Sequence, residues 1–186
     1  IDGRLEPGAE GEMVSGDYFR LLGVAPAAGR AIRPEDDRVP LGHPVAMLSY
    51  GYWKRRFALD PLVIGLALSI SGTPFTIIGV TPPEFFGVEV GSAPDLFVSL
   101  MMQPAVMPVS ENLLADPING VSWLRIVGRL ADGVSAPQAH AALAALAPGV
   151  EWRPRDKRGV VATDATLELT SAATGLSDLR TRFSTA

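Results

Sequence analysis

Residues 44–80, PVAMLSYGYWKRRFALDPLVIGLALSISGTPFTIIGV, decide the fold, because their hydrophobic periodicity changes twice along this one stretch. Pro44–Ser49 is a short apolar run of the kind found in buried strands. In Ser49–Ala58, three aromatic residues spaced i, i+3 and i+7 share one face of a helix, with the basic residues mostly off it. The segments ALSIS and FTIIGV then flank Gly72 and predict a hairpin. The stretch therefore predicts a strand, a helix and two more strands.

The same stretch contains the longest uncharged run of the chain, residues 61–83. Its length approaches the ~20 apolar residues that a transmembrane helix needs. However, Gly72-Thr73-Pro74 interrupts its middle, and polar residues alternate with apolar neighbours on both sides. The run is predicted to be a hairpin and not a membrane span.

Further elements are predicted on both sides of this stretch. Met13-Val14 continues a short strand towards Ser15, which can cap a helix that carries Tyr18 and Phe19 and ends at Gly23. Ala25–His43 is expected to be a loop. Further strands are predicted at Asp95–Leu100, Trp123–Leu130 and, more weakly, Gly159–Thr170. A helix is predicted to begin at Ser135 and to present Ala139, Leu143 and Leu146 towards a sheet. Another helix is predicted at Leu176–Phe183.

Composition narrows the class of protein. A chain of 186 residues with 47% hydrophobic content is long enough for one ordinary domain or two small ones. The absence of cysteine excludes disulfides, thiolate zinc sites and cysteine nucleophiles. A net charge of −4 argues against nucleic-acid binding as the main role. No signal peptide is present in these residues, and the chain is expected to be a piece of a larger protein.

Candidate reactive groups each have a simpler structural explanation. Glu35-Asp36-Asp37 lacks the alternating spacing of a calcium loop, so helix capping or a solvated loop is preferred to a metal site. His43 and His140 are the only histidines, and no G-x-S-x-G motif accompanies them, so both are interpreted as surface or structural residues. No catalytic, cofactor-binding or metal-ligating residue is predicted.

Two basic segments are weighed in the same way. Tyr52–Phe57, YWKRRF, could stack on bases, but its aromatic residues share a helical face and are better explained as core. Arg153–Arg158, RPRDKR, could contact anionic lipid headgroups, although a solvated loop is preferred. No phosphate-binding G-x-x-x-x-G-K-[ST] motif is present.

The order of the motifs is more specific than any one of them. VSGDYFRLLGVAPAAGRAIRPEDD, the 44–80 stretch extended to Phe85, DLFVSL, and WLRIVGRLADGVSAPQAHAAL follow one another along residues 11 to 183. In this order they resemble the MacB-like periplasmic core domain of MacB/FtsX-type ABC-transporter permeases, and especially the acidobacterial-type duplicated orphan permeases.

The resemblance implies an α+β fold made of two lobes. Residues 1–26 and 121–172 would form a porter-like α/β-sandwich subdomain, residues 27–120 an inserted Sabre-like α+β lobe, and residues 173–186 the start of the run into a following transmembrane helix. Tyr18, Phe19 and Leu22 would be core anchors, and Gly29-Arg30 would turn the chain into the second lobe.

The resemblance also implies a function. The chain would be a non-catalytic periplasmic domain of an inner-membrane permease, without a cofactor, that transmits conformational change in efflux, export or mechanotransmission. Its partners would be the transmembrane helices on both sides, a cytoplasmic ATPase acting indirectly, a periplasmic adaptor protein and a second copy of the permease.

The alternative is a ligand- or peptide-binding extracytoplasmic module with its site between the two lobes. The methionine- and proline-rich segment SLMMQPAVMP, Ser99–Pro108, would suit an apolar ligand, because methionine adapts to varied shapes. A loop packed on the core is the preferred interpretation of this segment.

Overall fold

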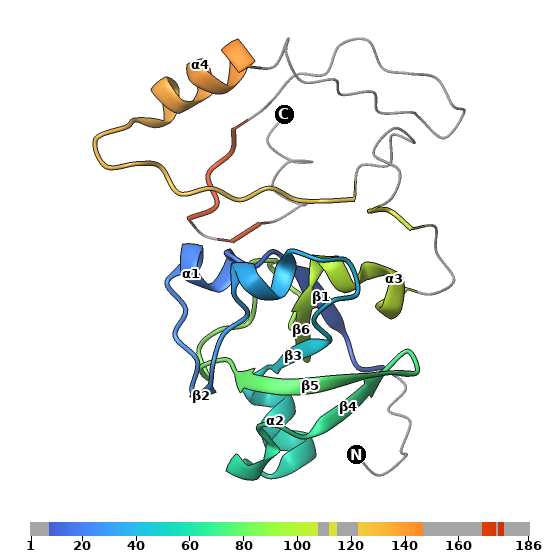
Figure 1. Cartoon of the computed structure of the whole chain (residues 1–186). Coiled ribbons are helices and arrows are strands. Elements are labelled where there is room, and N and C mark those ends of the chain that lie inside the picture. Colours follow the sequence, from blue (N-terminus) through green and yellow to red (C-terminus); the bar gives the residue numbers. More distant parts are fainter. Residues whose placement is uncertain (1–7, 108–111, 115–122, 147–168, 174, 177–186) are drawn as a thin grey trace. The chain divides into compact units, whose positions relative to one another are not determined.

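The computed structural model describes residues 8–107, 112–114, 123–146, 169–173 and 175–176 (Figure 1). The chain divides into two compact units. Unit 1 comprises Ile1–Leu114 and Leu176–Ala186, and unit 2 comprises Ala115–Gly175. The chain therefore passes from unit 1 to unit 2 and returns.

Unit 1 is built on one mixed sheet. Its strands are β1 (Gly11–Val14), β2 (Ala28–Gly29), β3 (Val45–Leu48), β4 (Ala67–Ile70), β5 (Thr73–Val80) and β6 (Leu96–Ser99). Its helices are α1 (Tyr18–Leu22), α2 (Tyr50–Phe57) and α3 (Gln103–Val106), with single 3-10 turns η1 (Pro34–Asp37), η2 (Pro61–Val63) and η3 (Leu100–Met102). The strand order is β1-β6-β3-β5-β2, and β4 also pairs with β5.

The sheet separates two hydrophobic clusters, because successive side chains of a strand point to opposite faces. In β6, Leu96 and Val98 belong to the larger cluster and Phe97 to the smaller one. Helix α2 contributes Tyr52 to the larger cluster, and α1 contributes Phe19 to the smaller one. Figure 1 shows these two helices on opposite sides of the strands. Unit 1 is thus a sheet covered on both faces.

A bulge in β5 changes which of its side chains point to each face of the sheet. Ala46 pairs with Ile77 and Met47 pairs with Gly79, so Ile78 has no partner in β3. A bulge of one residue restores the face of the residues that follow it. Ile77 and Val80 consequently both reach the larger cluster, although they are three residues apart.

The contact between β2 and β5 depends on two glycines that pair with each other, Gly29 and Gly79. A Cβ on Gly29 would lie 2.2 Å from the carbonyl oxygen of Ile78, and one on Gly79 would lie 2.1 Å from that of Arg30. Gly29 also has a φ of 67°. Only glycine allows the two backbones to approach this closely.

The predictions for the central stretch are confirmed. The predicted strand is β3, and the predicted helix is α2, whose N-cap Ser49 accepts a hydrogen bond from the backbone N–H of Tyr52. The hairpin is β4–β5, with Ser71 and Gly72 at positive φ in the turn. The predicted α+β fold class is likewise confirmed.

Two local expectations need correction. Ser15 does not cap α1 with its side chain: the N-cap is Asp17, without a side-chain cap hydrogen bond, because the chain turns once more before the helix begins. The helix does end at Gly23, with a φ of 72°. The loop predicted over Ala25–His43 also contains β2 and η1, which are too short to produce a periodic pattern.

In unit 2 the described residues contain one helix, α4 (Ala136–Leu146). It begins near Ser135, as predicted, but none of its residues is buried, and Leu143 and Leu146 are exposed. The described residues therefore show no sheet against this face. Trp123–Leu130, predicted to be a strand, has no paired strand among the described residues.

The expected lobe boundaries at residues 26–27 and 120–121 stay a prediction. Strand β1 precedes residue 26 and strand β2 follows it. In the sheet of unit 1, β1 pairs with β6 and β2 pairs with β5. Strand β1 is therefore part of one sheet with strands from residues 27–120. The assignment of porter-like and Sabre-like lobes to these units stays a prediction.

Candidate functional site

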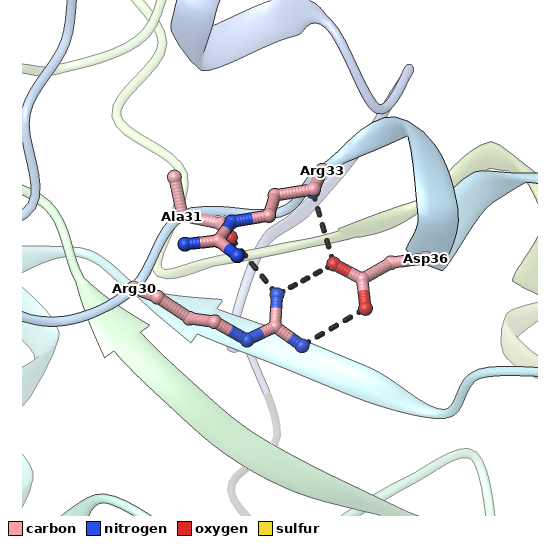
Figure 2. Close-up of polar contacts among 4 residues, drawn as sticks. All are labelled: Arg30, Ala31, Arg33 and Asp36. Carbon is pink, nitrogen blue, oxygen red and sulfur yellow. Dashed lines mark hydrogen bonds and ion pairs between the residues drawn. The ribbon is translucent and has the colours of Figure 1, made fainter.

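A polar cluster in unit 1 surrounds η1, and we call its residues, Arg30, Arg33, Asp36, Asp37 and Ser99, the acidic junction. Figure 2 shows the contacts that Asp36 makes with Arg30 and Arg33. Arg30 donates two hydrogen bonds to the Asp36 carboxylate, at 2.6 Å and 2.9 Å. The backbone N–H of Arg33 donates to the same carboxylate at 2.9 Å. Asp36 thus holds the η1 turn to the chain that leaves β2.

Asp37 extends the junction to other elements. Its carboxylate accepts hydrogen bonds from the backbone N–H of Gly16 at 3.0 Å, the backbone N–H of Met101 at 3.2 Å and the hydroxyl of Ser99. These donors lie before α1, in η3 and at the end of β6. The Asp37 carboxylate therefore ties its own η1 turn to two distant segments, the one before α1 and the junction of β6 with η3.

Hydrogen bonds from protein donors keep the buried Asp36 carboxylate charged. Burial by itself raises the pKa of Asp36, but the hydrogen bonds from Arg30 and the Arg33 backbone outweigh this, and the net pKa is lowered. The side chain is 8% exposed, whereas that of Arg30 is 37% exposed. Asp36 is charged at neutral pH, and its oxygens are already hydrogen-bonded to protein donors, which favours the structural interpretation of the acidic triplet over metal binding.

The basic and aromatic helix α2 is also engaged in structural contacts. Tyr52 is buried in the larger cluster, and the indole N–H of Trp53 donates to the carbonyl oxygen of Asp60 at 2.9 Å. Arg55 donates to Asp95 at 2.6 Å. The interpretation of its aromatic residues as core is confirmed for Tyr52.

Sequence reasoning missed Asp95, which joins three segments. Its carboxylate accepts from Arg55 of α2 and from the backbone N–H of Glu10 ahead of β1. A single acidic residue before a strand carries no sequence signal, because the partners come from positions 40 and 85 residues away.

A second feature that sequence did not reveal is an aromatic cluster. Tyr18, Phe19, Phe85 and Phe97 have ring centroids 5.1–6.3 Å apart. Tyr18 also donates to Glu12 at 3.1 Å, and burial together with the Glu12 charge raises the pKa of its phenol. Tyr18 therefore stays protonated and keeps this hydrogen bond at neutral pH.

Both histidines are exposed, and they belong to different units. His43 is exposed in unit 1, and His140 is exposed on α4 in unit 2. Within the described ranges no group of three or more His, Asp or Glu side chains is placed to hold a metal ion. Arg153–Arg158 lies outside the described residues, as does Leu176–Phe183 beyond its first residue.

The methionine- and proline-rich segment is largely packed on unit 1. Met102 is 2% exposed in the larger cluster, with Ala105 and Val106 packed against it. Gln103 is fully buried, and Met107 is exposed. The preferred interpretation, a segment packed on the core, is thus confirmed for Met102, Ala105 and Val106.

Asp36, Asp37 and Asp95 each accept several hydrogen bonds, so the polar groups described here hold the elements of unit 1 together. The sequence profile of the family described as the MacB-like periplasmic core domain matches residues 2–146, more than half of the chain. The chain belongs to this family. It is a periplasmic domain of the kind found in MacB-like ABC-transporter permeases.

Two solved structures are similar to this chain, and the first of them shares its fold. The periplasmic region of MacB from Actinobacillus actinomycetemcomitans is 18% identical, with a TM-score of 0.51 over 75% of this chain and 55% of that chain. The extracellular domain of the noncanonic ABC-type transporter YknZ from Gram-positive bacteria is 16% identical, with a TM-score of 0.41 over 55% of this chain and 52% of that one. The chain thus spans about half the length of each. A search of curated proteins gave no match.

None of the helices in the described part of the chain combines the length and apolar character needed to cross a membrane.

Proposed function

We propose that this chain is the non-catalytic extracytoplasmic domain of an ABC-transporter-type permease, and that it transmits conformational change between membrane helices and periplasmic partners. The observation that carries the proposal is the family match over residues 2–146. The proposed partners are membrane helices on both sides of the domain, an ATPase acting through them, a periplasmic adaptor and a second copy of the permease.

The construction of unit 1 supports a mechanical role. A body that transmits movement has to resist deformation, and this requires contacts between segments distant in sequence. Asp37 joins the segment before α1 to the end of β6 and to η3, while Asp95 joins α2 to the segment before β1. These carboxylates work as cross-links in a sheet that is already covered on both faces.

The first test is to sequence the native gene upstream and downstream of the segment that encodes these 186 residues. About 40 codons in each direction are enough for a ~20-residue membrane helix and its flanks. Apolar spans on both sides are expected. Stop codons or soluble domains immediately adjacent on both sides would contradict the permease assignment.

A ligand screen separates this function from the binding-module alternative. A ligand in excess over its dissociation constant raises the melting temperature of the protein that binds it. Lipids, peptides and apolar drugs are expected to leave the melting temperature of the 186-residue chain unchanged. A saturable rise with one of them would favour ligand capture.

A further inference from the structure

Strand β4 lies at an open edge of the sheet in unit 1. Among the described strands, β4 pairs with β5 alone, and Figure 1 shows no strand on its other side. Outer strands are usually protected from further pairing by charged residues, proline or very short length. At the other edges, β1 carries Glu12 and β2 has only two residues. Residues 65–72, GLALSISG, contain neither a charge nor a proline, so the edge of β4 lacks this protection.

The pairing of β4 with β5 shows which backbone groups of β4 point away from the sheet. In an antiparallel pair, residues that exchange hydrogen bonds with the neighbouring strand alternate with residues that do not. Leu66 accepts from the N–H of Ile77, and Ser69 lies opposite Pro74, which has no N–H to donate. Both observations indicate that the N–H and C=O groups of Ala67 and Ser69 point outward.

These two residues are complementary to the same two residues in a second copy of the chain. A two-fold axis at Leu68 brings Ala67 opposite the partner's Ser69, and Ser69 opposite the partner's Ala67. Each of these pairs can exchange two N–H···O=C bonds. Leu68 is partly buried against the larger hydrophobic cluster and would meet its own counterpart at the axis, where opposing side chains lie closest. The pairing therefore satisfies the outward groups and covers more of the apolar surface of Leu68.

The charge of this region favours a second copy over an acidic or basic partner. The uncharged run of residues 61–83 contains all of β4 and β5. Like charges directly opposite each other destabilise a pair of strands, and a two-fold axis brings an edge close to its own copy. An uncharged edge avoids this repulsion and offers no charge for a partner of opposite sign to complement.

From these observations we propose that unit 1 pairs with unit 1 of a second copy through an antiparallel contact between their β4 edges. The inference deepens the proposed function, on which it rests for the second copy as a partner, by naming the surface. Two four-residue strands make a smaller contact than the ~1,200–2,000 Å² of stable complexes. The pairing is therefore weak between free chains and stronger where the membrane holds two copies close together, because their effective concentration rises.

The register is tested by disulfide trapping in the 186-residue chain, which has no cysteine of its own. Ala67→Cys and Ser69→Cys change exposed positions. A mixture of the two variants is expected to form mixed disulfide dimers on mild oxidation, because hydrogen-bonded pairs have Cα atoms ~5.5 Å apart, within the ~4.4–6.8 Å that disulfides span. Each variant alone should give a several-fold lower yield, since its two cysteines are offset by two residues and lie more than ~7 Å apart. Mass spectrometry separates the three dimers, and equal yields would overturn the pairing.

The hydrogen bonds are tested by amide exchange of Ala67 in dilute and concentrated samples. Exchange in the parent is expected to slow as the concentration rises. Ser69→Pro removes an outward N–H and leaves the bonds to β5, since proline is tolerated where the N–H faces away from the sheet. It should move the slowing to an at least about tenfold higher concentration, because two of the four hydrogen bonds are lost. Ser69→Ala keeps the N–H and is the matched control. Should proline reduce folding, Ser69→Lys gives the same readout by placing a charge at the edge.

Other occupants of the edge give different results. Slow exchange of Ala67 even in dilute samples would mean that a segment of the same chain covers β4. Fast exchange at every concentration, without the mixed disulfide, would leave the edge to a strand of another protein. Either result would overturn the pairing of two copies. Neither would touch the permease assignment, which depends on the membrane spans encoded on both sides of this segment.

Discussion

At the scale of single residues, the close approach of β2 to β5 depends on a missing side chain. Gly79 has no methyl group to place against the carbonyl oxygen of Arg30, 2.1 Å from where a Cβ would lie. Backbone atoms cannot yield as the end of a flexible side chain can. The pairing of β2 with the sheet therefore depends on this residue.

Gly79→Ala is expected to lower the free energy of unfolding by about 1–3 kcal/mol or more, the usual cost of overpacking. Gly51→Ala is the matched control, because its Cβ would meet only the end of the Arg55 side chain, at 3.4 Å, in helix α2. Alanine favours a helix over glycine by up to ~1 kcal/mol, so this change should stabilise the chain. Urea unfolding of both variants measures the difference. Equal effects would mean that β2 does not approach β5 as closely as described.

Asp36 makes the free energy of unfolding depend on pH, and its stabilising contribution decreases as the pH falls. Because its folded pKa is lowered, its stabilising contribution is complete above the unfolded pKa of ~3.9 and is lost as the pH falls through the folded value. Asp36→Asn should lower the free energy of unfolding at pH 7 by about 1.5–3 kcal/mol, the range for hydrogen bonds to charged groups. The deficit should shrink as the pH falls below 4.

Urea unfolding of the parent and Asp36→Asn across this pH range checks the prediction. The control is Asp17→Asn, whose ion pair with Arg20 is largely exposed, at 51% and 77% of the side-chain surfaces. Exposed pairs of this kind contribute little. A deficit for Asp36→Asn that stays constant from pH 7 to pH 2 would show that the lost charge is not its cause.

At the scale of elements, strand β6 organises unit 1, because it lies between β1 and β3 and contributes to both clusters. Phe97 is fully buried and contacts the rings of Tyr18, Phe19 and Phe85. The smaller cluster thus links β6 with α1 and with the loop that holds Leu176.

Phe97→Ala should lower the free energy of unfolding by about 3–5 kcal/mol, as for other buried aromatic truncations. Phe86→Ala makes the same chemical change at a side chain that is 64% exposed, and its effect should be within ~0.5 kcal/mol. Thermal and urea unfolding compare the two. A similar cost for both variants would contradict the assignment of Phe97 to the core.

At the scale of the whole molecule, the structural roles of the acidic residues predict that metal ions do not change the stability of the protein. In the described part of the chain, Asp36 and Asp37 accept from protein donors, and no group of potential ligands forms a metal site. Chelation with EDTA should leave the melting temperature unchanged, and so should added Mg²⁺, Ca²⁺ or Zn²⁺. A reproducible loss of stability on chelation, restored by one of these ions, would reveal a metal site.

Much of the local structure could be predicted from the sequence. Strand β3, helix α2 with its Ser49 cap and the β4–β5 hairpin follow from hydrophobic period and turn residues, because these signals lie within a few positions of one another. The structural role of Glu35–Asp37 could likewise be predicted, because three consecutive acidic residues lack the alternating spacing of a calcium loop. The order of the motifs indicated the family.

The sequence by itself therefore determined strand β3, helix α2, the β4–β5 hairpin and the family of this protein. Only the tertiary structure decided which segments join one sheet, that Ile78 forms a bulge, and that Asp37, Asp95, Gln103 and Leu176 cross-link distant segments. The physical reason is the range of the interactions. Helix and hairpin signals are local, whereas strand pairing and buried hydrogen bonds join residues whose separation along the chain leaves no periodic trace.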